Sequence, residues 1–147
     1  FAPYVNAYRP LTPAASGPVN AKWGYDNRTT AFRVPRSDPA ARRVENRIPS
    51  SDANPYLALA ASLACGLLGM NNRIEPDAPA STTVNDNLIE LPRGLIEATI
   101  LFEQDKDLIA MLGQSFAITY AAIKRAEFET FMEVISPWER EFLLLNV

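Results

Sequence analysis

The sequence contains no histidine and one cysteine, Cys65, among its 147 residues. Without histidine, these residues cannot form a Ser-His-Asp or Cys-His catalytic site, and a metal site would have to rest mainly on carboxylates. A single cysteine also excludes an internal disulfide and a cysteine-cluster zinc site. No apolar run approaches the roughly 20 residues of a membrane-spanning helix, and no secretory signal is visible. We therefore expect a cytoplasmic protein with no membrane partner.

Charge is distributed unevenly along the chain. Hydrophobic residues make up 48% and charged residues 21%, which predicts one domain with a buried core. Residues 1–50 carry a formal charge of +5, whereas the remaining 97 residues carry −8. Seven of the eight cations in the first segment are arginines, which suit bidentate binding of phosphate or carboxylate. The first third of the chain is therefore the expected anion-binding region.

The order of secondary-structure signals predicts an α+β fold, in which antiparallel strands carrying the arginine-rich site precede a layer of four to five helices. Residues 1–18 are rich in proline and predict an irregular arm, residues 19–48 predict strands, and residues 54–147 predict mostly helix. Helix starts are expected at Asn54-Pro55, Pro92, Asp105, residue 114 and Ser136-Pro137. Residues 55–70 are apolar on nearly every side, which predicts a fully buried helix with Cys65 in the core.

Three charged residues are expected to share one face of the strand at residues 42–48. Arg43, Glu45 and Arg47 alternate along it, and residues two apart in a strand point the same way. One interpretation is a salt-bridge ladder on a solvated face. The other is a functional surface on which Glu45 binds a cation and the arginines bind anions. Exposed ion pairs contribute only about 0–1 kcal/mol, so stability alone is a weak reason for three charges there.

Arg28 and Arg33 on the preceding strand would add a second group of cations. If both strands face one cleft, the arginines converge near Glu45 and repel one another unless phosphates and a divalent metal ion lie between them. Phosphoryl transfer needs such an arrangement, because the charge on the transferred group must be neutralised. The sequence has no glycine-rich phosphate loop, so side chains would bind the phosphates. Nucleic acid is a less favoured partner, because the sequence pI is about 5.0 and aromatic residues are few.

Several ordered segments resemble the carboxy-terminal part of the glutamine synthetase catalytic domain. They are Asn6-Ala7-Tyr8-Arg9, residues 23–35 (WGYDNRTTAFRVP), residues 41–47 (ARRVENR) and Asp52-Ala53-Asn54-Pro55-Tyr56-Leu57. The resemblance is dense over residues 5–70 and looser afterwards. The segment Ile135-Ser136-Pro137-Trp138-Glu139-Arg140-Glu141 is more similar to the γ-glutamylpolyamine (γ-glutamylputrescine) synthetase branch.

The resemblance implies an ATP-dependent carbon–nitrogen ligase that phosphorylates glutamate and lets an amine or ammonia displace the phosphate. Glu45 then corresponds to a metal ligand for Mg²⁺ or Mn²⁺. Arg33 and Arg43 correspond to ATP contacts, Arg28 to a group that stabilises the transferred phosphoryl, and Arg47 to a contact with glutamate or its phosphate. The family forms homo-oligomeric rings. Ammonia-using glutamine synthetase is the alternative activity, and a non-catalytic binding or assembly module is the alternative of another class.

Two departures from the family pattern concern substrate binding. Pro10 follows Tyr8-Arg9 where the family usually has a second basic residue, and Ala40 stands where a lysine is frequent. The chain starts at Phe1 without an initiator methionine, so we expect residues 1–147 to be a portion of a longer catalytic domain. The amino-terminal β-grasp domain and the upstream catalytic half would then be absent. We expect these residues alone to be inactive.

Overall fold

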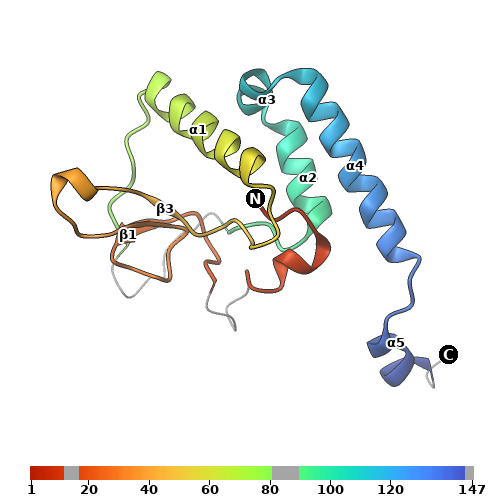
Figure 1. The fold of residues 1–147 in the computed structure, drawn as a ribbon. Helices are drawn as coiled ribbons and strands as arrows, with labels where there is room; N and C mark the ends of the chain where they lie inside the picture. The colour runs from red at the N-terminus through yellow and green to blue at the C-terminus, as the bar shows by residue number, and fades with distance from the viewer. Residues whose placement is uncertain (12–16, 81–89, 145–147) are drawn as a thin grey trace.

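The computed structural model describes residues 1–11, 17–80 and 90–144. Within these residues, short strands follow an N-terminal 3-10 turn, and five α-helices complete the order. Figure 1 shows the strands beside the helical layer, with α5 beyond the end of α4. In this described part, no helix is long and apolar enough to cross a bilayer. The expected α+β class is confirmed.

The sheet has three short strands in the order β1-β2-β3. These are β1 (Trp23–Tyr25), β2 (Phe32–Val34) and β3 (Glu45–Asn46). β2 pairs with β3 antiparallel, as predicted, and places Arg33 directly opposite Glu45. β1 and β2 pair in parallel, which differs from the expected antiparallel arrangement. The sheet is therefore mixed.

The parallel pair results from a tight loop between β1 and β2. Each strand has only three residues, about 10 Å, so the six-residue connection can return to the start of β2 without a crossover helix. Asp26 begins the loop with φ 49°, a left-handed conformation that Asp tolerates better than most residues. The buried Thr30 hydroxyl lies 2.9 Å from the Asn27 carbonyl oxygen and 3.0 Å from that of Phe32. These contacts fix the loop that carries Arg28.

The helices begin close to the predicted residues. They are α1 (Pro55–Asn71), α2 (Leu95–Gln104), α3 (Lys106–Leu112), α4 (Gln114–Met132) and α5 (Pro137–Phe142). The Asn54 side chain accepts hydrogen bonds from the first turn of α1, and the Asp105 side chain caps α3. Ser136 and Glu139 form a reciprocal capping box at α5. α2 starts at Leu95 instead of Pro92, with Gly94 as its N-cap.

The buried core lies where the N-terminal segment meets α2 and α4. Residues 1–11 include the 3-10 helix η1 (Val5–Tyr8), and the core cluster consists of Ala2, Ala7, Tyr8, Leu11 and Leu95. Phe128 of α4 packs against it. The proline-rich start of the chain therefore supplies much of the core, in addition to leading into the strands.

The prediction that α1 is buried on every side is wrong. Ala64 is its only buried residue, whereas Leu59, Leu63 and Met70 are 64%, 67% and 75% exposed. Cys65 is also exposed, which corrects its predicted burial. An all-round apolar helix needs partners on every face. Within the described residues, α1 packs mainly against α3, so most of its surface is uncovered.

Candidate functional site

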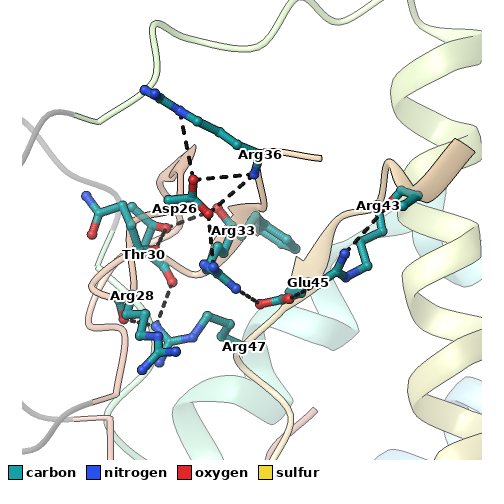
Figure 2. Close-up of polar contacts among 11 residues, drawn as sticks. Asp26, Arg28, Thr30, Arg33, Arg36, Arg43, Glu45 and Arg47 are labelled. Atoms are coloured by element: carbon teal, nitrogen blue, oxygen red, sulfur yellow. Dashed lines mark hydrogen bonds and ion pairs between the residues drawn. The ribbon is translucent and has the colours of Figure 1, made fainter. Parts of the chain in front are cut away.

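Arg33 on β2 and Glu45 on β3 form the centre of a charged network. The strand register places them opposite each other, and Arg33 Nη1 lies 2.7 Å from Glu45 Oε2. Arg43 approaches the same carboxylate from the segment before β3, with Nη2 3.3 Å from Glu45 Oε1. Both Glu45 oxygens therefore accept hydrogen bonds from guanidinium groups (Figure 2). Arg43 and Glu45 of the predicted strand face are in contact, and Arg33 of the preceding strand joins them.

Asp26, at the start of the β1–β2 loop, is a second carboxylate in the network and is not among the predicted site residues. Its Oδ1 lies 3.0 Å from Arg33 Nη2 and accepts from the backbone amide of Arg36 at 3.3 Å. The Arg36 Nε lies 3.8 Å from Asp26 Oδ2. Asp26 thus fixes the second side of the Arg33 guanidinium. An acidic residue at the start of the short loop that leads to an arginine-bearing strand is the pattern that could have predicted this role.

The Arg47 side chain contacts backbone carbonyl groups, whereas Arg33 and Arg43 contact the Glu45 carboxylate. Its Nη1 donates to the carbonyl oxygen of Arg28 and, at 3.3 Å, to that of Thr30, so it ties the end of β3 to the β1–β2 loop. Among the described residues, the Arg28 guanidinium has no hydrogen-bond or ion-pair partner. Figure 2 shows Arg28 and Arg47 together on one side of the Arg33–Glu45 pair. The structure therefore brings all five predicted site residues into one neighbourhood.

The network has a surplus of positive charge and of hydrogen-bond donors. Residues 26–47 contain six arginines and three acids. The hydrogen bond from Arg33 lowers the pKa of Glu45 below its ordinary value, and Arg43 acts in the same direction. The same Glu45 bond raises the pKa of Arg33. Arg33 Nε is buried without an acceptor among the described atoms, whereas the exposed Arg28 guanidinium can donate to an anion that brings several oxygens.

A complete divalent-metal site does not exist within the described residues. They contain no group of three or more His, Cys, Asp or Glu side chains close enough to hold an ion. Glu45 can offer one oxygen ligand, but both of its oxygens already accept from arginine. Mg²⁺ requires near-octahedral oxygen coordination and is usually held by carboxylates, phosphates and water together. These residues therefore fit a metal only with further ligands from outside the described part of the chain.

The same geometry keeps both interpretations of the Arg43-Glu45-Arg47 pattern open. Ion pairs at Glu45 agree with a salt-bridge ladder. However, Arg33 retains only 19% exposure of its side chain and Glu45 33%, so the central pair is half-buried and not a fully solvated ladder. The cluster also departs from simple alternation, because Arg47 turns toward the β1–β2 loop.

Comparison with protein families matches residues 1–143 to the catalytic domain of glutamine synthetase. Among curated proteins, the chain is 37% identical to γ-glutamylputrescine synthetase of Escherichia coli over 151 residues, covering 99% of this chain and 31% of that protein. It is 34% identical to γ-glutamylethanolamide synthetase of Streptomyces coelicolor, covering 95% and 30%. It is 36% identical to glutamine synthetase of Thermococcus kodakarensis, covering 91% and 32%.

Solved structures show the same likeness in three dimensions. Ligand-free GmaS matches with a TM-score of 0.82 at 32% identity, covering 97% of this chain and 33% of that chain. An ADP complex of GmaS also matches with a TM-score of 0.82, at 33% identity, covering 97% and 35%. The chain thus spans about a third of the length of these relatives. The relatives include a glutamine synthetase as well as γ-glutamylethanolamide and γ-glutamylputrescine synthetases at similar identity.

Proposed function

The chain belongs to the glutamine synthetase catalytic-domain family, and from this premise we propose that it carries the phosphate-binding arginines of an ATP-dependent glutamate ligase. The observation that carries the proposal is the donor-rich network around Glu45. Four arginines and one carboxylate of the predicted set lie together there, and both Glu45 oxygens already accept from guanidinium groups. A transferred phosphoryl group spreads negative charge over several oxygens, which such a network would stabilise.

Each residue has a specific role in this proposal. Arg33 and Arg43 bind ATP phosphate oxygens, and Arg28 and Arg47 stabilise the phosphoryl group and the glutamate end of the substrate. Glu45 contributes one ligand to Mg²⁺ or Mn²⁺ when the remaining ligands are supplied. The metal would neutralise phosphate charge. Asp26 is a positioning residue, because it holds Arg33 from the side opposite Glu45.

For the acceptor, we propose an amine of the putrescine kind. The support is the similarity of residues 135–141 to that branch and the 37% identity to the E. coli putrescine enzyme. Ammonia is the second candidate, because glutamine synthetase of T. kodakarensis is 36% identical. Pro10 stands where the family usually has a basic residue that binds the substrate carboxylate. A ligase built on these residues should therefore bind free glutamate weakly.

A chimeric enzyme tests the activity. Residues 1–143 replace the matched third of the E. coli γ-glutamylputrescine synthetase, and phosphate release is measured with ATP, Mg²⁺, glutamate and a panel of acceptors. The panel contains ammonia, putrescine, ethanolamine and isopropylamine. We expect glutamate-dependent turnover that is highest with putrescine. A correctly folded chimera that binds ATP but turns over no acceptor would instead support a non-catalytic module.

Neighbouring arginines provide a matched pair of variants in the same chimera. Arg43 contacts Glu45, whereas Arg42 is exposed and lies outside the proposed site. We expect Arg43→Gln to reduce kcat/KM about 10²-fold or more, because it removes a donor aimed at transition-state charge, and Arg42→Gln to change it less than threefold. Equal effects of the two variants would show that only general positive charge matters.

A further inference from the structure

A side-chain hydrogen bond joins the strand that carries Glu45 to α1. Asn46 Nδ2 of β3 donates to Ser62 Oγ of α1 at 3.2 Å, and both side chains are half-buried. Asn46 Oδ1 accepts from the backbone amide of Ile48 at 3.2 Å. The Asn46 side chain is therefore held at both ends, by the backbone of its own segment and by the helix.

Both partners of this bond are polar residues in apolar stretches of sequence. Asn46 lies between Val44 and Ile48 on the strand face opposite to Glu45. Ser62 is the one residue with a hydroxyl group in residues 57–70, which are otherwise apolar. Apolar contacts have no preferred direction, whereas a hydrogen bond needs a defined distance and angle. The pair can therefore fix where α1 lies along β3, which apolar contact alone would not do.

The strand β3 is too short to fix its own orientation firmly. It has two residues, Glu45 and Asn46, which pair with Arg33 and Phe32 of β2. Within the described residues, α1 packs mainly against α3, so few other contacts hold β3 against α1. Successive strand residues point to opposite faces, so a rotation of Asn46 about the strand axis turns Glu45 with it. Anchoring Asn46 on one face therefore fixes the Glu45 carboxylate on the other.

We propose that Asn46 and Ser62 are positioning residues for Glu45, because their hydrogen bond holds β3 against α1. This role rests on the proposed function, in which Glu45 contributes one ligand to a divalent metal ion. The two residues act through the strand backbone, since Asn46 lies on the face opposite to Glu45. Mg²⁺ demands near-ideal ligand geometry, so a loosened Glu45 should weaken metal binding while the other ligands remain in place.

The metal requirement of nucleotide binding tests this role in the chimera. Equilibrium dialysis with labelled ADP gives the Mg²⁺ concentration at which ADP binding is half-maximal. We expect Ser62→Ala to raise that concentration about fivefold, because one hydrogen bond is lost. Alanine is the better helix former, so the melting temperature should stay nearly unchanged. Ser62→Thr, which keeps a hydroxyl group, should restore the original metal requirement, and Asn72→Ala at an exposed asparagine is the control.

Combined variants separate positioning of Glu45 from a general loosening of the fold. Asn46→Ala should match Ser62→Ala, and the variant with both changes should be no worse than either, because all three lose the same bond. In a Glu45→Gln background, Ser62→Ala should change the metal requirement less than twofold, since the ligand that it positions is already gone. Effects of Ser62→Ala that are equally large with and without Glu45 would overturn the positioning role.

The same measurements distinguish failure of this role from failure of the proposed function. If Glu45→Gln raises the metal requirement at least tenfold but Ser62→Ala leaves it unchanged, the positioning role is wrong and Glu45 keeps its proposed role. If Glu45→Gln itself has no effect, both are wrong. Thermal denaturation identifies an Asn46→Ala chimera that does not fold, and the Ser62→Ala and Ser62→Thr pair then decides alone. ADP binding does not depend on turnover, so an inactive chimera gives the same information.

Discussion

Arg33 joins two carboxylates that come from different parts of the chain. It lies 2.7 Å from Glu45 and 3.0 Å from Asp26, so its guanidinium is held from two directions. Glu45 in turn is shared with Arg43. The charged side chains of the site therefore orient one another. A substitution at one position should therefore change the behaviour of its neighbours.

Glu45→Gln should make the stability of the protein less sensitive to acid. The folded-state pKa of Glu45 lies below its ordinary value of 4.5, because Arg33 bonds its ionised form. Because the folded-state pKa is depressed, the ionised Glu45 side chain stabilises the fold above about pH 4.5. This stabilisation is lost as the pH falls through the folded-state pKa. Urea midpoints measured between about pH 5.5 and pH 3 should fall less for Glu45→Gln than for the wild type.

The exposed Glu75 is the control for this experiment, because it lies in the segment after α1 and forms no ion pair with Arg33 or Arg43. Glu75→Gln should follow the wild-type pH dependence. An equally steep loss of stability in Glu45→Gln and the wild type would show that the Arg33–Glu45 pair does not contribute to acid sensitivity.

Tyr8 should make the stability of the protein fall as the pH rises in the alkaline range. Burial, followed by Tyr120 and Glu97, raises its pKa from 10.0 to about 12. Because the folded-state pKa is raised, the neutral Tyr8 hydroxyl stabilises the fold below about pH 10. This contribution is lost as the pH rises toward 12. Thermal midpoints at about pH 9 and pH 11.5 should therefore differ less in Tyr8→Phe than in the wild type. Tyr25→Phe, at an exposed tyrosine, should behave as the wild type.

At the level of elements, local capping decides where the helices begin. Asn54 accepts from the backbone amides of Tyr56 and Leu57 at 3.0 and 3.3 Å. Asn54→Ala should lower the free energy of unfolding by about 1 kcal/mol, because two amide groups lose their acceptor. Asn71→Ala, at the other end of α1, is the matched control and should change it by less than about 0.5 kcal/mol. Chemical denaturation measures both, and equal losses would contradict the capping role.

Sequence prediction succeeds for features that nearby residues determine. Asn54-Pro55, Asp105 and Ser136-Pro137 each mark a helix start, because a cap and its amide partners lie within four residues. The antiparallel pairing of Arg33 with Glu45 is also consistent with the expected strand faces. The parallel pairing of β1 with β2 depends on the loop geometry at Asp26, and no sequence periodicity encodes it.

The burial of a helix depends on its contacts throughout the molecule, and for α1 the prediction of burial from sequence is wrong. Its composition demands partners on every face, yet most of its apolar side chains are exposed. The composition of a helix reflects everything that it contacts in its complete setting, whereas these residues amount to about a third of the length of the relatives. For the same reason the sequence could place Glu45 among the arginines but could not supply the remaining metal ligands.

The residues described by the structure should be unable to catalyse ligation alone. Glu45 is the single carboxylate assigned to the metal, and no group of three metal-binding side chains surrounds it in residues 1–11, 17–80 and 90–144. Phosphoryl transfer depends on neutralising charge and aligning the reactants, and one ligand cannot hold a divalent ion firmly enough to do this. Purified residues 1–147, assayed for γ-glutamyl transfer with ATP, glutamate, Mg²⁺ and putrescine, should release phosphate at the rate of a protein-free blank. The chimera is the positive control under the same conditions. Turnover by the isolated chain that disappears in Glu45→Gln would show instead that the arginine network and one carboxylate suffice.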